Sequence, residues 1–579
     1  MNIIVKKLMS EFIEDYEIEE VDDAKQFEYF STYCVVENKF DEDFSTDYII
    51  GDGGDHGIDG ILIYCNGEIV TDLDQADDLI ARSKKLMGLE FVCIQAKTSE
   101  KFCASEISNF GYGVNKLFES AVDQNTPFNA SNAGIEKYRT IISKLYDNAA
   151  KFSDNPILTC YYITNGMWED DQECSDRLTS IKKDLLKLNL FKEVQVEAVD
   201  ARKIQAIYRS IKTDCTVQIP LKECVELEGE IDNVEQVIIG SITADDFLTL
   251  ITDNSSEIKK SVFTDNIRDF QGDKGVNQEI RQTIESDPSK FFLYNNGVTV
   301  ICKKITSLPK KKYELVGYQI VNGCQTSHVL YNSRNIEGLS EISLPIKLIQ
   351  TTDGDIINSI IKATNHQTAI KDDQLLTLSE YHKSLEDYFK TFSGDNQLFY
   401  ERRSRQFVTD SSVDRKKIVS IKTLVSSVAA MFYDKPHFSS RYYGRLIDTL
   451  AGKLFKPNHK PINYYTASYA HYKIERFCKS EPDFKPYYRY RYHFLMMLAY
   501  SLQGKFPEFH TKKSENYCKL ILNTVNDQAE LTKRMKSFLN ILKCYVDDPK
   551  NEQYSKSADI VDNLKSDTIK LYRESYPKK

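Results

Sequence analysis

Residues 57–70 read GIDGILIYCNGEIV and residues 89–97 read LEFVCIQAK, and these two stretches decide how the first part of the chain folds. The first predicts two short strands that turn at Asn66-Gly67, because this dipeptide accommodates the positive φ angles of a type I′ hairpin. The second is an apolar run of strand length that ends abruptly in polar residues, which is typical of a buried strand. We therefore expect a hairpin, a connecting helix at 73–87 and a third strand in one sheet.

The segments around these strands predict an α/β layer. Residues 24–37 (AKQFEYFSTYCVVE) carry apolar and aromatic residues at helical spacing and predict a helix before the hairpin. Beyond residue 97, helical and strand patterns alternate, as they do in α/β domains. The expected helices are 104–120, 134–151, 175–188 and 200–211, and the expected strands are 157–163 and 193–199.

The rest of the chain divides into a mixed region and a helical region. A polar, acidic stretch at 222–236 indicates a boundary, and a mainly helical, tyrosine-rich pattern begins after residue 410. At 579 residues the chain is too long for one hydrophobic core. The expected fold class is a multidomain α/β and α+β protein: a mixed sheet flanked by helices, then an α+β domain, then a mainly helical region. The predicted domains are 1–215, 216–410 and 411–579.

Composition and charge exclude several classes of protein. The chain is 41% hydrophobic and 28% charged, with 14 prolines, which is typical of globular rather than disordered protein. It has no apolar run of membrane-spanning length and no secretory core near its start, so we expect a cytoplasmic protein without a membrane partner. The 13 cysteines lack a C-x-x-C pair and are expected to be reduced. A net charge of −11 restricts any nucleic-acid contact to local basic patches.

The strongest local signal is the motif G-I-D-G at 57–60, followed by Q-A-K at 95–97, with Glu28 on the preceding helix. Hydrolysis of a phosphodiester needs a hard cation held by oxygen ligands, an activated water, and positive charge against the transition state. The aspartate and the glutamine supply oxygen ligands, and the lysine supplies the positive charge. Because strand side chains alternate, the glutamine and the lysine project to the same face.

This arrangement resembles the PD-(D/E)xK restriction-endonuclease-like superfamily, in its G-x-D-G…Q-x-K form, over roughly residues 20–215. The resemblance implies a nuclease that depends on Mg²⁺, with Mn²⁺ as an alternative. It also implies that Asp59, Gln95 and Glu28 are metal ligands and that Lys97 positions or activates water. The habit of the superfamily favours DNA over RNA as the nucleic-acid partner.

Two features depart from the usual pattern of that superfamily. Gln95 replaces the commoner Glu or Asp, which removes a negative charge from the site, and the long separation from Asp59 requires an inserted helix. One alternative is that GDGGDHGIDG (51–60) is only a turn and that Lys97 ends a sheet edge. Another is a site that has lost its activity, in a module that binds nucleic acid or a phage protein as a sensor.

Three further polar residues, Asp52, Asp55 and His56, crowd the same loop. We do not expect zinc there, because no second His or Cys stands at ligand spacing. His56 is therefore interpreted as a loop residue. No nucleophile-elbow sequence indicates a Ser/His/Asp triad.

Several phrases between about 260 and 410 resemble the abortive-infection phage-resistance (AIPR) family. They are VFTDNIRDFQG (262–272), VNQEI (276–280), FFLYNNGVTV (291–300), YQIVNGCQT (318–326), KATNHQTAI (362–370) and FYERRSRQF (399–407). The resemblance implies antiphage defence by abortive infection, in which this region senses a phage-derived trigger or restrains the nuclease. We also expect a homodimer, since paired sites cut both strands and symmetric assemblies are common.

Cationic and turn motifs in the same half of the chain each have two interpretations. Arg402, Arg403 and Arg405 form the densest cationic cluster, and their guanidinium groups suit either nucleic-acid phosphates or pairing within the protein. KPYYRYRYH (485–493) could stack on unpaired nucleotides, but the apolar helix that follows favours packing with snorkelling arginines.

The remaining motifs predict turns. Asn295-Asn296-Gly297 and Asn322-Gly323 indicate tight turns, with contact to a polar ligand as the alternative. PKKKY (309–313) predicts a surface hairpin turn.

Overall fold

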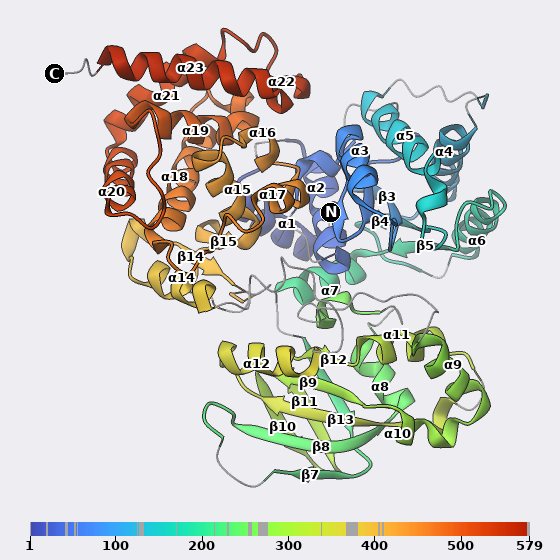
Figure 1. The fold of residues 1–579 in the computed structure, drawn as a ribbon. Coiled ribbons are helices and arrows are strands. Elements are labelled where there is room, and N and C mark those ends of the chain that lie inside the picture. Colours follow the sequence, from blue (N-terminus) through green and yellow to red (C-terminus); the bar gives the residue numbers. More distant parts are fainter. Residues whose placement is uncertain are drawn as a thin grey trace. The chain divides into compact units, whose positions relative to one another are not determined.

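The computed structural model divides the chain into two compact units, residues 1–369 and 370–579, whose elements are labelled in Figure 1. The residues described are 2–18, 21–40, 44–50, 54, 56–123, 125–126, 132–169, 171–212, 215–227, 231–252, 258–263, 276–336, 339–365, 380–402, 406–407, 410 and 412–575. The predicted fold class, with mixed sheets followed by a helical C-terminal region, is confirmed.

The first unit begins with a five-stranded mixed sheet in the order β2-β1-β3-β4-β5. Strand β1 is antiparallel to β2 and β3, whereas β3, β4 and β5 are parallel. The strands are β1 (Gly60–Cys65), β2 (Glu68–Ile69), β3 (Glu90–Lys97), β4 (Ile157–Thr164) and β5 (Glu193–Val199). The predicted hairpin is present, since Asn66 and Gly67 have φ angles of 53° and 85°, as a type I′ turn requires.

The strands of this sheet are buried on both sides because helices cover both of its faces. Along β3, Phe91 and Cys93 join one apolar cluster, while Val92 and Ile94 join another. The first cluster includes side chains of α3 (Leu73–Arg82), α4 (Ala104–Val122), α5 (Ala133–Tyr146) and α6 (Gln172–Leu186). The second includes side chains of α1 (Ile3–Tyr16), α2 (Asp23–Phe40) and α7 (Ala201–Lys212). Helix α3 is the insertion expected between the hairpin and β3.

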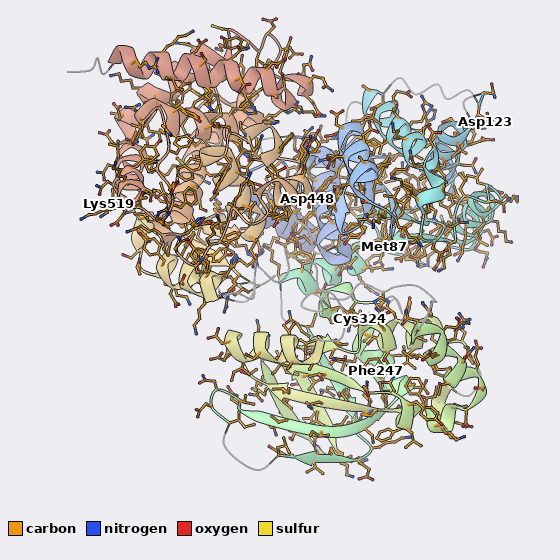
Figure 2. The ribbon with its side chains drawn as sticks, viewed as in Figure 1. Met87, Asp123, Phe247, Cys324, Asp448 and Lys519 are labelled. Atoms are coloured by element: carbon orange, nitrogen blue, oxygen red, sulfur yellow. The ribbon has the colours of Figure 1, made fainter. Side chains whose placement is uncertain are left out.

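The first unit also contains a second five-stranded sheet, β12-β9-β13-β8-β7, and a three-stranded sheet, β10-β11-β6. The strands are β6 (Thr216–Pro220), β7 (Cys224–Glu226), β8 (Gln236–Thr243), β9 (Val298–Cys302), β10 (Lys304–Leu308), β11 (Lys312–Val316), β12 (Gln319–Asn322) and β13 (Ser343–Gln350). The helices are α8 (Ala244–Ile251), α9 (Val276–Ser286), α10 (Phe291–Tyr294), α11 (Cys324–Asn332) and α12 (Gly354–Asn365). Phe247 and Cys324, labelled in Figure 2, belong to the apolar core that these sheets and helices form.

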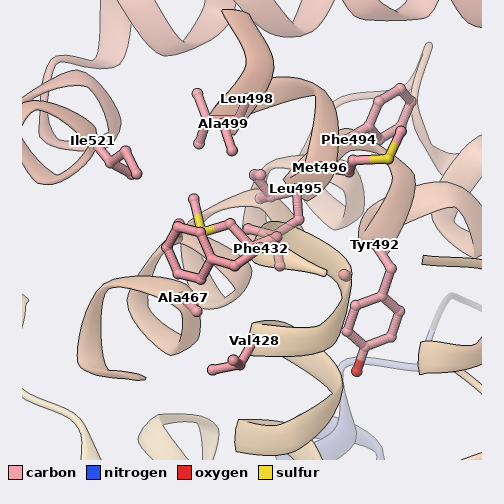
Figure 3. Close-up of a cluster of buried hydrophobic side chains, with 14 of the residues drawn as sticks. Val428, Phe432, Ala467, Tyr492, Phe494, Leu495, Met496, Leu498, Ala499 and Ile521 are labelled. Carbon is pink, nitrogen blue, oxygen red and sulfur yellow. The ribbon is translucent and has the colours of Figure 1, made fainter. Parts of the chain in front are cut away.

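The second unit is mainly helical. Its helices are α14 (Glu380–Lys390), α15 (Ile421–Phe432), α16 (Pro436–Ser439), α17 (Tyr443–Leu450), α18 (Pro461–Ser480), α19 (Arg491–Leu502), α20 (Lys512–Asn526), α21 (Gln528–Leu542), α22 (Glu552–Lys556) and α23 (Ala558–Ser575). Two short parallel strands, β14 (Phe399–Glu401) and β15 (Ile418–Ser420), join them. Figure 3 shows Phe494, Leu495 and Met496 of α19 within the core.

Side chains from α14 and β14, such as Leu385 and Tyr400, also belong to the core of the helical unit. The domain boundary predicted between residues 410 and 411 stays a prediction. Helix α14 and strand β14, which precede it in the chain, pack into the core of the helical unit. Within the described part of the chain, no helix combines the length and the apolar character needed to cross a membrane.

Candidate active site

The carboxyl end of β3 opens into a pocket beneath the first turns of α4. The pocket has a volume of about 320 Å³. Its lining consists of Gly57, Gln95, Lys97, Ser105, Glu106 and Asn109. The predicted glutamine and lysine thus lie on the same face of β3, and they face a helix that the sequence analysis did not associate with the site.

Asp59 lies immediately before β1 and is only 5% exposed. Its Oδ2 accepts a hydrogen bond of 2.8 Å from the Ala96 N–H and is 3.7 Å from the Lys97 ammonium. Its own N–H donates to the Ile94 carbonyl. These contacts hold the carboxylate at the point where the β1–β3 ladder ends, beside the strand that carries the pocket residues.

Gln95 is a pocket residue with a buried polar atom that has no hydrogen-bond partner in the part of the chain that the structure describes. The side chain is 2% exposed, and its Oε1 has no hydrogen-bond partner among the described residues. Gly57, at φ +81°, makes room for it, since a Cβ at this position would lie 2.6 Å from Gln95 Nε2. A buried amide oxygen without a partner costs free energy, so it calls for a water, a donor or a cation.

Lys97 brings positive charge to the same pocket. Its side chain remains 34% exposed although it pairs with Asp59, whose side chain is 7% exposed. The structure therefore brings together Asp59, Gln95 and Lys97, three of the residues predicted from the sequence. Their roles in catalysis stay predictions.

Glu106 is a pocket residue that sequence reasoning missed. It lies in the first turn of α4, and its Oε2 accepts a 2.9 Å hydrogen bond from the hydroxyl of Tyr162. Tyr162 lies opposite Gln95 in the β3–β4 register. Burial, together with the hydrogen bond to Glu106, raises the pKa of Tyr162 well above its usual value, so the hydroxyl stays protonated and donates.

Glu28, the fourth predicted site residue, does not line this pocket. It lies on α2, whose apolar side chains belong to the cluster on the other face of the sheet. Its Oε2 is 2.6 Å from the Lys25 ammonium, which is also 3.3 Å from the Ile50 carbonyl. Since the Ile50 N–H donates to the Asp59 carbonyl, these contacts connect Glu28 to Asp59 through Lys25 and Ile50. Its role as a metal ligand stays a prediction.

The chemistry of the pocket fits a hard divalent cation better than a softer one. Magnesium prefers oxygen ligands and retains several waters, so it needs few protein groups. Glu106 and the unpaired oxygen of Gln95, which line the pocket, are groups of this kind, and so is Asp59, which does not line the pocket but pairs with the pocket residue Lys97. In the described ranges, no three His, Cys, Asp or Glu side chains gather closely enough to hold a metal by themselves. Any cation here would depend on the amide oxygen and on water.

His56, in the glycine-rich loop, does not line the pocket. His56 is in the left-handed region, at φ 54°, and its ring meets Tyr112 edge-on at 6.5 Å. The predictions for Asp52 and Asp55 fall outside the described residues. The interpretation of His56 as a loop residue agrees with this geometry.

Arg402 is buried inside the helical unit. It is 6% exposed, and its Nε lies 3.1 Å from Glu386 Oε2. Gln406 completes the group, because it accepts from the Arg402 N–H and donates to Glu386. Of the two interpretations of the arginine cluster, pairing within the protein describes Arg402. The predictions for Arg403 and Arg405 lie outside the described residues.

The aromatic and basic stretch at 485–493 packs within the protein. Arg491 lies 4.6 Å from the ring of Tyr488, and Arg489 pairs with Glu552 at 3.0 Å. Tyr490 is fully buried. These contacts agree with the packing interpretation.

The polar turn motifs of the central region hold one another. Asn295 accepts from the Gly297 N–H and donates to Thr326 Oγ1 at 3.1 Å, and Asn277 donates to Gln325 at 2.7 Å. The turn at 309–313 is also present, because Lys310 and Lys311 have positive φ between β10 and β11. The hairpin turn at 309–313 is therefore confirmed, and Gly297, at φ 79°, lies in a bend closed by Asn295. Asn322 is instead the last residue of β12, and Gly323, at φ 96°, is the N-cap of α11.

Comparison with known proteins supports one of the two resemblances. Residues 263–550 match the family model described as AIPR protein. This region is therefore similar to the AIPR family, which is associated with abortive-infection defence against phage. Searches among curated proteins and among solved structures found no match.

Proposed function

We propose that the N-terminal layer of this protein is a Mg²⁺-dependent nuclease of the PD-(D/E)xK type, which cuts nucleic acid during abortive infection. The AIPR match supports the defence context. The observation that carries the chemistry is the meeting of Asp59, Gln95 and Lys97 at the end of one strand, beside a pocket that contains an unpaired buried oxygen.

Each of these residues has a defined task in the proposal. Asp59 and Gln95 hold the cation through oxygen atoms, and the backbone of Ala96 orients the aspartate. Bound Mg²⁺ supplies Lewis-acid chemistry and offsets the charge of the phosphate. Lys97 orients the attacking water and stabilises negative charge that develops on the phosphate in the transition state. DNA is the proposed substrate ahead of RNA.

The test compares the purified full chain with its Asp59→Ala and Lys97→Ala variants on plasmid DNA and on total RNA, with Mg²⁺ or with chelator. The wild type is expected to cut DNA with Mg²⁺ only. Each variant is expected to lose about a hundredfold to a thousandfold in rate, the usual cost of removing one transition-state contact.

Lys187→Ala is the matched control, because Lys187 is 75% exposed and pairs with Asp184 within one helical turn. It is expected to cut like the wild type. Equal behaviour of the wild type and both site variants on every substrate would overturn the proposal. It would leave the alternative of a binding sensor without activity, for which the neutral Gln95 is the supporting feature.

A further inference from the structure

We infer that Glu106 supplies the second carboxylate of the cation site, in place of the acid that is missing at position 95. This inference rests on the proposed function, since it assigns a ligand to the same pocket. Glu106 belongs to a different secondary-structure element from the three predicted residues. It reaches the pocket from α4, while Gln95 and Lys97 reach it from β3.

Charge in the pocket favours this assignment. Asp59 and Lys97 form an ion pair of 3.7 Å, so their formal charges cancel, and Gln95 is neutral. Without another acid the group would offer a divalent cation oxygen atoms but no net negative charge. Glu106 gives the four residues a net charge of −1. A cation is held more tightly where carboxylates outnumber the nearby positive charges.

The position of the Glu106 side chain is fixed by its neighbours. Tyr162 donates to Oε2 at 2.9 Å, and its own ring is buried. A carboxylate has about four lone-pair positions, so one hydrogen bond leaves it able to bind a cation. Hydrogen bonds of this kind orient metal ligands and are themselves important for affinity. Tyr162 is therefore a positioning residue for Glu106.

Glu28 is less suited to this task. Its carboxylate forms a 2.6 Å ion pair with Lys25, which offsets its charge, and its helix packs against the face of the sheet opposite to the one that carries Gln95 and Lys97. A cation at the end of β3 therefore has Glu106 as the second acid that shares the pocket with Gln95.

The experiment measures Mn²⁺ binding to the full chain without nucleic acid, from the electron paramagnetic resonance signal of free Mn²⁺. Glu106→Gln keeps the size of the side chain and removes its charge. We expect it to weaken Mn²⁺ binding by about 10- to 100-fold, since changes even beyond the direct ligands cost this much. Glu119→Gln is the control, because Glu119 lies on the same helix and pairs with Lys116 outside the pocket.

Tyr162→Phe tests the positioning role. It is expected to weaken Mn²⁺ binding less than Glu106→Gln, and to add nothing when the two are combined, because the tyrosine acts through the glutamate. Circular dichroism of every variant checks that the fold is kept. Additive losses in the double variant would contradict the positioning role of Tyr162.

The outcomes separate this inference from the proposed function. Unchanged Mn²⁺ binding in Glu106→Gln, with cleavage by the wild type intact, would overturn the inference and leave the nuclease proposal standing. A loss in Glu28→Gln instead of Glu106→Gln would also overturn it, in favour of the ligand expected from the sequence. Mn²⁺ binding that depends on Glu106 in a wild type that cuts nothing would support the metal site and overturn the nuclease proposal.

Discussion

Lys97 and Arg402 are both cations beside an acid, yet their surroundings differ. The Lys97 side chain is 34% exposed and its ammonium lies 3.7 Å from Asp59, at the edge of a pocket. The Arg402 side chain is 6% exposed and lies 3.1 Å from Glu386, in the core of the helical unit. In the sequence, the arginine belongs to a cluster of three and the lysine stands alone at a strand end. Clustering of charge along the chain therefore does not indicate which of these two cations lies at the pocket.

The amide side chains next to the two cations also differ in how completely they are hydrogen-bonded. Around Arg402, Gln406 both donates and accepts, so its amide is used within the protein. Around Lys97, the amide oxygen of Gln95 is buried and has no partner among the described residues. The amide of Gln406 therefore has both its oxygen and its nitrogen paired, whereas the oxygen of Gln95 keeps capacity for a ligand.

The largest effect on stability is expected from Arg402→Ala. It removes the buried cation beside Glu386, which keeps the exposed Lys390 at 3.1 Å and the hydrogen bond from Gln406. The cost is therefore expected near the lower end of the range for a broken buried ion pair, about 3 kcal/mol. The measurement is the free energy of unfolding of the helical unit in urea. Lys513→Ala, at an exposed position of the same unit, is expected to change it by less than about 0.5 kcal/mol. A similarly small change in Arg402→Ala would remove the distinction between the two cations.

Lys97→Ala is expected to show the opposite profile. The cleavage rate falls about a hundredfold or more. The free energy of unfolding is expected to change by no more than about 1 kcal/mol, because the lysine is one-third exposed, its ammonium is 3.7 Å from the carboxylate, and the buried Asp59 keeps the hydrogen bond from the Ala96 N–H. Rate and stability are measured on the same preparation. A loss of stability as large as that of Arg402→Ala would mean that Lys97 also serves mainly to hold the fold.

The pH dependence of the helical unit gives an effect of intermediate size. Burial lowers the pKa of His471 to about 4, whereas the unfolded chain takes up this proton near pH 6.5. The unfolded state therefore binds more protons between these values, and the free energy of unfolding falls as the pH drops from about 6.5 toward 4. This histidine alone accounts for about 2 kcal/mol at pH 5.

His471→Gln should remove that share of the acid sensitivity. Urea unfolding at pH 7.5 and at pH 5 measures it, as the difference between the wild type and the variant. His493 and His437, whose pKa values burial lowers to about 3 and about 4, are expected to leave some acid sensitivity in both proteins. The same loss of unfolding free energy between pH 7.5 and pH 5 in both proteins would contradict the assignment to His471.

The smallest expected effect is the difference between alanine substitutions at Gly57 and at Gly67. Gly57 and Gly67 both have positive φ, at +81° and +85°, but a Cβ would meet Gln95 only at Gly57 and meets nothing within 4 Å at Gly67. Alanine at either position is expected to cost about 1–2 kcal/mol in backbone strain. Only Gly57→Ala should also weaken Mn²⁺ binding. Equal Mn²⁺ affinity in the two variants would mean that the fit of Gln95 against Gly57 does not matter.

Periodicity and turn chemistry predicted most of the N-terminal layer. Strand β5 was predicted with its observed bounds, and β3 to within one residue. The helix predicted at 134–151 ends at Tyr146, because Asn148 donates to the Lys144 carbonyl and a 3-10 turn follows at Ala149–Lys151. Asparagine and aspartate compete in this way with the helical hydrogen bonds.

The site was predicted only in part, for a physical reason. Asp59, Gln95 and Lys97 lie on neighbouring strands, where alternation and order along the chain place them near one another. Glu106 depends on how α4 packs over the ends of β3 and β4, which no local pattern encodes. The burial of Arg402 likewise depends on Glu386 and Gln406, whose approach is decided by tertiary packing.

A single oxygen of Asp59, Oδ2, connects the backbone of β3 to the pocket. It accepts the hydrogen bond from the Ala96 N–H, in the position that a main-chain carbonyl would take, and it also faces the ammonium of the pocket residue Lys97. Occupation of the pocket should therefore slow hydrogen exchange at the Ala96 amide. The exchange rate of this one amide proton would report ligand binding in the pocket without any substrate.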